Sequence, residues 1–246
     1  MTASTPTTVL VHGAFTDGSY WAAVADRLLC AGMPVSVPEN PLRGLKTDVE
    51  ALLRSVRQIA GSVLLVGHGY GGAVVPHAAA RIDNVLGQVL VASCGIEQGR
   101  SIAEIVADFP APLVASATGS RLGPPGCTSE LFIHADRFAE VFAADLSVGR
   151  SSVMAVSQRL VDSRAFSRPL AGPFAGQTCP NWCLVTTRDQ VIHPEVQRAA
   201  ARRLQATTTE VSASHAVALS QPETVTVFIL KALEALERRR LSGQSI

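Results

Sequence analysis

The sequence has almost no excess charge of either sign. It contains 21 Lys and Arg residues against 20 Asp and Glu residues, so the formal net charge is only +1 at pH 7. Proteins that bind nucleic acid or an anionic membrane surface usually carry a clear basic excess. The composition therefore argues against both partners and favours a small-molecule substrate, with a homodimer left open.

Long apolar runs and leader patterns are also missing. No stretch approaches the roughly 20 apolar residues that span a bilayer. Met1 to Thr8 lack the charged start and apolar run of a signal peptide, so we expect a cytoplasmic protein. The 246 residues, 47% of them hydrophobic, suffice for one α/β domain (1–246) with a large core.

The five cysteines follow no metal-binding or redox spacing. The closest pair, Cys179 and Cys183, is separated by three residues, which fits neither a redox motif nor a common zinc hairpin. Buried free thiols are the expected state, and we expect no metal and no cofactor. Cys94 follows a predicted strand that ends near the main motif, so it is a candidate pocket residue rather than a nucleophile.

Short β-branched runs alternate with helical patterns along most of the chain. This alternation predicts βαβ units and a mostly parallel sheet with helices on both faces. The expected strands span 8–11, 35–37, 62–66, 88–92, 182–186 and 208–211. The expected helices span about 20–31, 47–60, 72–81, 194–204 and 222–240.

The alternation stops between residues 96 and 177, where no strong strand is expected. Helical patterns at 136–144 and 151–160 predict a helical lid, at about residues 100–177, inserted before the strand at 182–186. Its apolar residues have two readings: they form the lid's own core, as stripes at helical spacing usually do, or some of them roof an apolar pocket. The pocket candidates are Phe132, Phe138 and Met154.

The stretch Val66–Gly72, VGHGYGG, is the most informative motif of the chain. It is typical of the strand-to-helix elbow that carries the nucleophilic serine of G-x-S-x-G hydrolases, but its central residue is Gly69. Asp189 and His215 follow in the chain order nucleophile, acid, base. Both come after predicted strands, at the carboxyl ends where open α/β sheets place their sites.

A second glycine motif follows the first predicted strand, at His12-Gly13-Ala14-Phe15. Glycine there lets the backbone approach a substrate closely. The N–H groups of Ala14 and Tyr70 are therefore a candidate oxyanion hole.

These segments together resemble the α/β-hydrolase superfamily, and more narrowly its small lidded esterases, methylesterases and hydroxynitrile lyases. The matching segments are 9–15, 63–72, 187–194 and 214–222. The resemblance implies an α/β-hydrolase fold in which Asp189 accepts the ring N–H of His215 and fixes its tautomer. His12 and His68 flank the site, where histidines of this family mostly support loop backbone; with Phe15 they are candidates for substrate contact.

The sequence departs from the family pattern at two positions. Ala216 stands where the plant hydroxynitrile lyases have a lysine that holds cyanide, which argues against that activity. Gly69 closes the covalent route through serine. An elbow strains a central residue with a side chain by about 1–3 kcal/mol, so a lineage that no longer used the hydroxyl would gain stability from glycine. An experimenter would more often choose alanine, so a natural glycine is favoured.

Three functions stay open. In the first, Asp189, His215 and the oxyanion amides perform acid–base chemistry on a small apolar carbonyl- or phenol-containing molecule, as in cyclisation, carbon–carbon bond formation, elimination or epoxide opening. By analogy with related enzymes, an enzyme of this first kind would act in specialised metabolism. The second is a serine esterase or lactonase in which glycine was introduced at position 69. The third is a non-catalytic ligand-binding protein, which the intact acid–base pair argues against.

Overall fold

A computed structural model describes residues 5–127, 129–175 and 179–242. Its main sheet has six parallel strands in the order β2-β1-β3-β4-β8-β9. The strands are β1 (Thr7–Val11), β2 (Val35–Ser36), β3 (Val63–His68), β4 (Val85–Val91), β8 (Asn181–Thr186) and β9 (Thr207–Val211). All six expected strands are confirmed. The inner strands β3, β4 and β8 are buried and largely apolar, as strands covered on both faces are. The edge strands β2 and β9 are half-buried to exposed, and their β-branched residues gave the signal.

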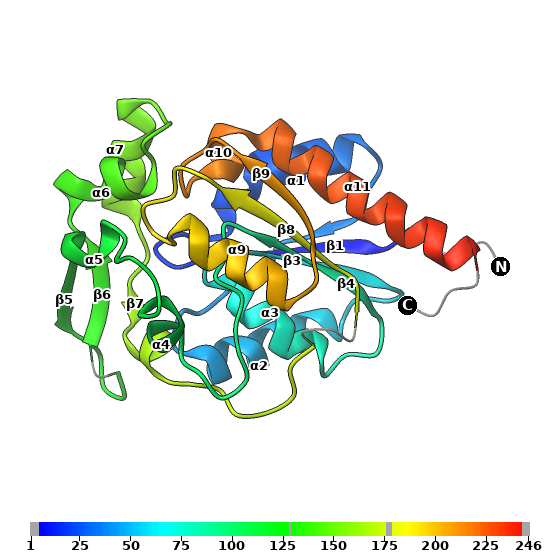
Figure 1. The fold of residues 1–246 in the computed structure, drawn as a ribbon, viewed down its shortest axis with the longest axis horizontal. Helices are drawn as coiled ribbons and strands as arrows, with labels where there is room; N and C mark the ends of the chain where they lie inside the picture. Colours follow the sequence, from blue (N-terminus) through cyan, green and yellow to red (C-terminus); the bar gives the residue numbers. More distant parts are fainter. Residues whose placement is uncertain (1–4, 128, 176–178, 243–246) are drawn as a thin grey trace.

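Helices cover both faces of this sheet. Helices α1 (Ala22–Cys30) and α11 (Pro222–Leu241) lie together on one face, and α2 (Leu45–Val56) and α3 (Gly71–Ala79) lie on the other (Figure 1). A short 3-10 helix, η1 (Gly18–Trp21), precedes α1, and α10 (Val217–Ser220) precedes α11. Helix α9 (Pro194–Arg203) packs on β8. A proline in the first turn starts both α9 and α11.

The strand order changes direction between β1 and β3. From β1 the chain adds β2 on one side, and it then crosses over to add β3, β4, β8 and β9 on the other. The register pairs Val11 with Gly67, so the loops that follow β1 and β3 meet at the same sheet edge. Open α/β sheets bind ligands at such a switch point.

The insertion between β4 and β8 lies at one end of the sheet (Figure 1). It holds α4 (Ile102–Val106), α5 (Val114–Ala117), β5 (Thr118–Leu122), β6 (Ser129–Ile133), α6 (Ala135–Phe142), α7 (Val148–Ser157), β7 (Val161–Asp162) and α8 (Arg164–Ser167). The expected helices at 136–144 and 151–160 correspond to α6 and α7. Helix α7 ends early because Gln158 turns out of it and exchanges two 2.8 Å hydrogen bonds with the Ile133 backbone.

The insertion also contains an antiparallel sheet in the order β5-β6-β7, which the expectation of a purely helical lid missed. Strand β5 is half-buried to exposed along its length and reads TGSRL, so it has no apolar alternation to reveal it. This segment becomes a strand because it pairs with β6. The expected end of the lid at Gln177 lies outside the described residues.

Candidate functional site

The turn from β3 into α3 is built around two glycines. Gly69 has a left-handed backbone with φ of +52°, where side chains are strained. Gly67 lies against the start of α3: a Cβ on it would come within 2.6 Å of backbone atoms of Gly71 and Gly72. The elbow geometry is therefore present, with glycine at its centre.

Replacing Gly67 with alanine is expected to lower the free energy of unfolding by about 1–3 kcal/mol, because backbone cannot yield as a side chain does. Gly149→Ala is the matched control, since a Cβ there meets nothing within 4 Å. Replacing a glycine inside a helix with alanine raises the free energy of unfolding by roughly 0.5–1 kcal/mol at most. Urea unfolding followed by circular dichroism measures both; equal stabilities would show that the elbow is loosely packed.

His215 and Asp189 are brought together from the loops that follow β9 and β8. The His215 Nδ1 lies 2.8 Å from Asp189 Oδ2, and the two side chains are 3% and 0% exposed. Asp189 Oδ1 accepts the backbone N–H groups of Val191 and Ile192 at 2.8 and 2.9 Å. A carboxylate with both oxygens engaged holds the imidazole in one orientation.

Two further side chains position Asp189. Its Oδ2 also accepts the Thr186 hydroxyl at 2.8 Å and the Gln197 side-chain amide at 2.9 Å. Neither residue was predicted from the sequence. Their positions could have indicated this role, because Thr186 ends the strand before Asp189 and Gln197 lies one turn into the next helix.

The other nitrogen of His215 faces Gly69. A Cβ built on Gly69 would lie 2.9 Å from His215 Nε2 and 3.2 Å from Cε1, closer than a side-chain carbon normally comes. The imidazole thus occupies space that a serine side chain would need. Nε2 is presented directly to the cavity that His215 lines.

The two expected oxyanion residues, Ala14 and Tyr70, line the same cavity. Within the described part of the chain, neither of their backbone N–H groups donates a hydrogen bond. The Tyr70 hydroxyl donates at 2.6 Å to Asp48, a buried carboxylate whose pKa burial raises. This bond ties the residue after Gly69 to α2.

His12 and His68 do not line the cavity, and their ring nitrogens contact backbone instead. His12 Nδ1 lies 3.0 Å from the Gly13 carbonyl, and its Nε2 accepts the Asn40 N–H at 3.2 Å. His68 Nε2 donates at 2.9 Å to the carbonyl of His215. Burial lowers the pKa of both imidazoles, most strongly for His68. These two candidates for substrate contact are therefore supports of the surrounding loops.

The insertion holds the loop that carries His215. Asp145 accepts the Ser214 N–H at 2.8 Å and also the Ser214 hydroxyl. The Phe142 carbonyl accepts the Ala216 N–H at 3.0 Å, and the Phe142 ring packs edge-on against the imidazole with centroids 4.8 Å apart. From η1, the Tyr20 hydroxyl donates to the His215 carbonyl at 3.1 Å.

The cavity above Gly69 has a volume of about 230 Å³ and mostly apolar walls. Phe15 and Cys94 line it, as expected; burial raises the pKa of the Cys94 thiol to about 12, so it is a packing residue. The insertion supplies wall residues that the sequence analysis did not single out for the pocket. They include Ile102, Val106, Val114, Leu131 and Phe166.

Three insertion residues expected at the pocket lie elsewhere. Phe138 is fully buried and stacks on Phe142, so it belongs to the core of the insertion. Phe132 lies on the outer side of β6 against His134. Met154 lines a separate groove between α7 and the loop after β1. Helical spacing identified an apolar face but not the element that would cover it.

Within the described ranges, no group of three or more His, Cys, Asp or Glu side chains is arranged to hold a metal ion. No helix among the same residues is long and apolar enough to cross a membrane.

A family model described as the alpha/beta hydrolase family matches residues 8–227. Polyneuridine aldehyde esterase superposes with a TM-score of 0.79 at 18% identity, covering 93% of this chain and 99% of that one. A pyrethroid hydrolase from Sphingobium faniae gives 0.76 at 18% identity, with 94% and 98% covered. An Arabidopsis methylesterase gives 0.74 at 16% identity, with 93% and 99% covered. No curated protein sequence matches the chain. At these identities the structural likeness establishes the fold alone.

Proposed function

Because the chain belongs to the alpha/beta hydrolase family, whose members are generally enzymes, we propose that it is an enzyme that works without a serine nucleophile. It uses Asp189 and His215 for acid–base chemistry on a small, largely apolar carbonyl- or phenol-containing molecule. Cyclisation, carbon–carbon bond formation, elimination and epoxide opening all fit this chemistry, which needs no cofactor. The chain acts as a single domain, and the insertion, at about residues 100–177, is its lid.

The observation that carries this proposal is the position of His215 Nε2. It lies 2.9 Å from where a Cβ of residue 69 would be, while Nδ1 is held by Asp189 at 2.8 Å. The base thus meets the substrate directly, without an intervening hydroxyl. A proton donor or acceptor in a buried, mostly apolar cavity is positioned for general acid–base catalysis.

In the proposed reaction, Nε2 removes a proton from a carbon next to a carbonyl group, or from a phenol. The N–H of Nδ1 stays hydrogen-bonded to Asp189, which stabilises the imidazolium that forms. The negative charge that develops on the substrate oxygen is stabilised by the free N–H groups of Ala14 and Tyr70. His215 then returns its proton to the rearranged product, so the protein ends unchanged.

The two alternatives are less well supported. Several of the superposed proteins are esterases or hydrolases, but here His215 faces a glycine, and a serine at position 69 would require a small shift of the imidazole. A pure binding protein would gain little from a buried carboxylate whose oxygens accept five hydrogen bonds and aim a histidine at the cavity. We infer that glycine is natural at position 69, because it relieves the strain of the left-handed backbone there.

The unmodified protein is expected to exchange the α-protons of small ketones for deuterium without forming a covalent intermediate. Phenylacetone, propiophenone and cyclohexanone are suitable probes, with exchange in deuterium oxide followed by proton NMR. A fluorophosphonate probe should give no stoichiometric labelling, because labelling requires an alkoxide-forming residue at the elbow. Exchange no faster than with an equal concentration of free imidazole would contradict the proposal, and so would stoichiometric labelling.

A further inference from the structure

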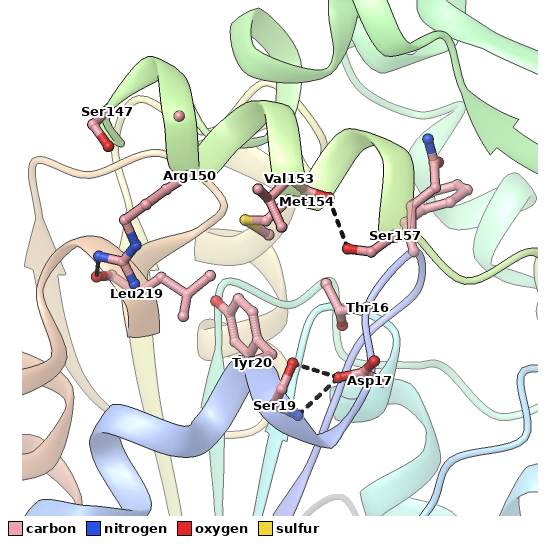
Figure 2. A pocket seen from close by; sticks show the side chains of 13 residues that line it. Thr16, Asp17, Ser19, Tyr20, Ser147, Arg150, Val153, Met154, Ser157 and Leu219 are labelled. Carbon is pink, nitrogen blue, oxygen red and sulfur yellow. Dashed lines mark hydrogen bonds between the residues drawn. The ribbon is translucent and has the colours of Figure 1, made fainter.

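We call the cavity lined by His215, Ala14 and Tyr70 the catalytic cavity. A second hollow lies beside it, between the loop after β1 and helix α7. It has a volume of about 530 Å³. Figure 2 shows Thr16, Asp17, Ser19 and Tyr20 on one side, with Ser147, Arg150, Val153, Met154 and Ser157 of the α7 segment on the other. Leu219, from the helix after the His215 loop, closes the end near Arg150 (Figure 2). We call this hollow the outer groove.

Phe15 separates the outer groove from the catalytic cavity and lines both. It is only 5% exposed and has a left-handed backbone with φ of +62°, a strained conformation for a bulky residue. Such strain persists where the surrounding structure holds it, often at ligand sites. A ligand that passes the edge of Phe15 would occupy both spaces.

The volumes indicate that a substrate larger than a single ring would need both spaces. The catalytic cavity, at about 230 Å³, is smaller than the roughly 300–1,000 Å³ of pockets that bury a drug-sized ligand. It holds a single ring or a short chain. The outer groove is more than twice as large, so a larger substrate would place its reacting part inside and the remainder in the groove.

Most hydroxyl groups of the outer groove already donate hydrogen bonds within the protein. Thr16 donates to the Gly13 carbonyl at 3.1 Å, Ser19 to Asp17 at 2.6 Å, and Ser157 to the Val153 carbonyl at 2.8 Å. The Tyr20 hydroxyl donates to the His215 carbonyl. The groove therefore has few donors left for a ligand, apart from those of Arg150.

Arg150 has most of its hydrogen-bonding capacity free. It is exposed, and among the described residues it makes one hydrogen bond, at 3.3 Å to the Leu219 carbonyl, and no ion pair. Asp17 lies toward the other end of the groove (Figure 2), where hydrogen bonds from Ser19 lower its pKa and Arg159 is its cationic neighbour. Arginine with free N–H groups is suited to a planar carboxylate.

We propose that the outer groove is a second binding site that takes the carboxylate-ended tail of an elongated amphiphilic substrate. The apolar ring or chain at the other end of this molecule occupies the catalytic cavity, and Arg150 pairs with the tail. This assignment rests on the proposed function for what happens in the cavity. Binding by the groove itself requires no chemistry.

Calorimetric titration with ω-phenylalkanoates, from propanoate to octanoate, tests the proposal against the matching phenylalkanols and phenylalkylamines. Once the chain is long enough to reach Arg150, the carboxylates should bind about three- to five-fold more tightly than alcohols of the same length, as for a partly exposed ion pair. Arg150→Gln should abolish this advantage and leave the alcohols unchanged. High salt should weaken it. Equal affinities of carboxylates and alcohols, or tighter binding of the amines, would overturn the proposal.

Two control variants locate the ligand. Arg54→Gln removes an exposed arginine on α2, outside the groove, and should leave the carboxylate advantage intact. Ala103→Trp places a large side chain at an exposed residue that lines the catalytic cavity, and should weaken every probe if the phenyl ring binds inside. An equal loss in Arg54→Gln would overturn the assignment of the carboxylate to Arg150. Unchanged binding in Ala103→Trp would show that the phenyl ring does not bind in the catalytic cavity.

The same titrations on His215→Ala separate the groove from the reaction. If the unmodified protein shows no ketone exchange but its preference for carboxylates depends on Arg150, the proposed chemistry fails and the groove assignment stands. If the unmodified protein exchanges ketone protons but does not prefer carboxylates to alcohols, the groove assignment alone is overturned.

Discussion

Replacing His215 with alanine is expected to slow ketone α-proton exchange by about 10²–10⁴-fold, the usual contribution of a positioned proton-transfer group. The imidazole is the titratable side chain whose free nitrogen faces Gly69 at the wall of the catalytic cavity. Affinity for phenylpropanoate should change much less, because the apolar walls remain. Exchange by NMR and calorimetric titration of the same preparations measure the two effects.

Asp189→Asn should slow exchange as well, because an amide no longer stabilises the imidazolium and favours the wrong tautomer. His134→Ala is the matched control: it removes an exposed histidine packed beside Phe132, away from the cavity. If His215→Ala and Asp189→Asn lower the rate no more than the control does, the proton-transfer group lies elsewhere in the cavity.

The change Gly69→Ser is expected to make the protein reactive toward the fluorophosphonate probe, which leaves the unmodified chain unlabelled. The new hydroxyl would lie beside His215 Nε2, the arrangement that activates a serine. The same change should lower the free energy of unfolding by about 1–3 kcal/mol, because position 69 has a left-handed backbone. The required shift of the imidazole adds to this cost.

Labelling followed by mass spectrometry, together with urea unfolding, measures both consequences of Gly69→Ser. Gly69→Ala is the control, since it introduces the same strain and the same Cβ without a hydroxyl. A Gly69→Ser variant that is folded but unlabelled would show that this site no longer has serine-hydrolase geometry. A variant as stable as the unmodified protein would show that the elbow is relaxed.

The sequence was sufficient to predict the six-stranded sheet and the meeting of Gly69, Asp189 and His215 at its edge. Parallel strands buried on both faces leave continuous apolar runs, and motifs at their carboxyl ends converge by topology alone. The hydrogen bond between Asp189 and His215 follows from that convergence. The approach of Nε2 to Gly69 does not, because it depends on the ring position within the cavity.

The insertion was harder to predict for physical reasons. Helices α4 and α5 have five and four residues, too short for a helical period to show which side chains face inward. Ile102 and Val114 reach the cavity through tertiary packing that local sequence does not encode. Phe138 shows the converse, since it shares a helical stripe with Phe142, on which it stacks, and that stripe faces the core of the insertion.

Asp145 and the Phe142 carbonyl accept hydrogen bonds from the loop around His215, so the insertion is mechanically coupled to the catalytic base. Any excursion that lifts α6 from the sheet must break these bonds and release the backbone on both sides of the imidazole. Asp189, Tyr20 and His68 would still hold His215, but its two chain neighbours would lose their bonds to the insertion. Admission of solvent from this side and loosening of the loop that carries the base would thus occur in the same event.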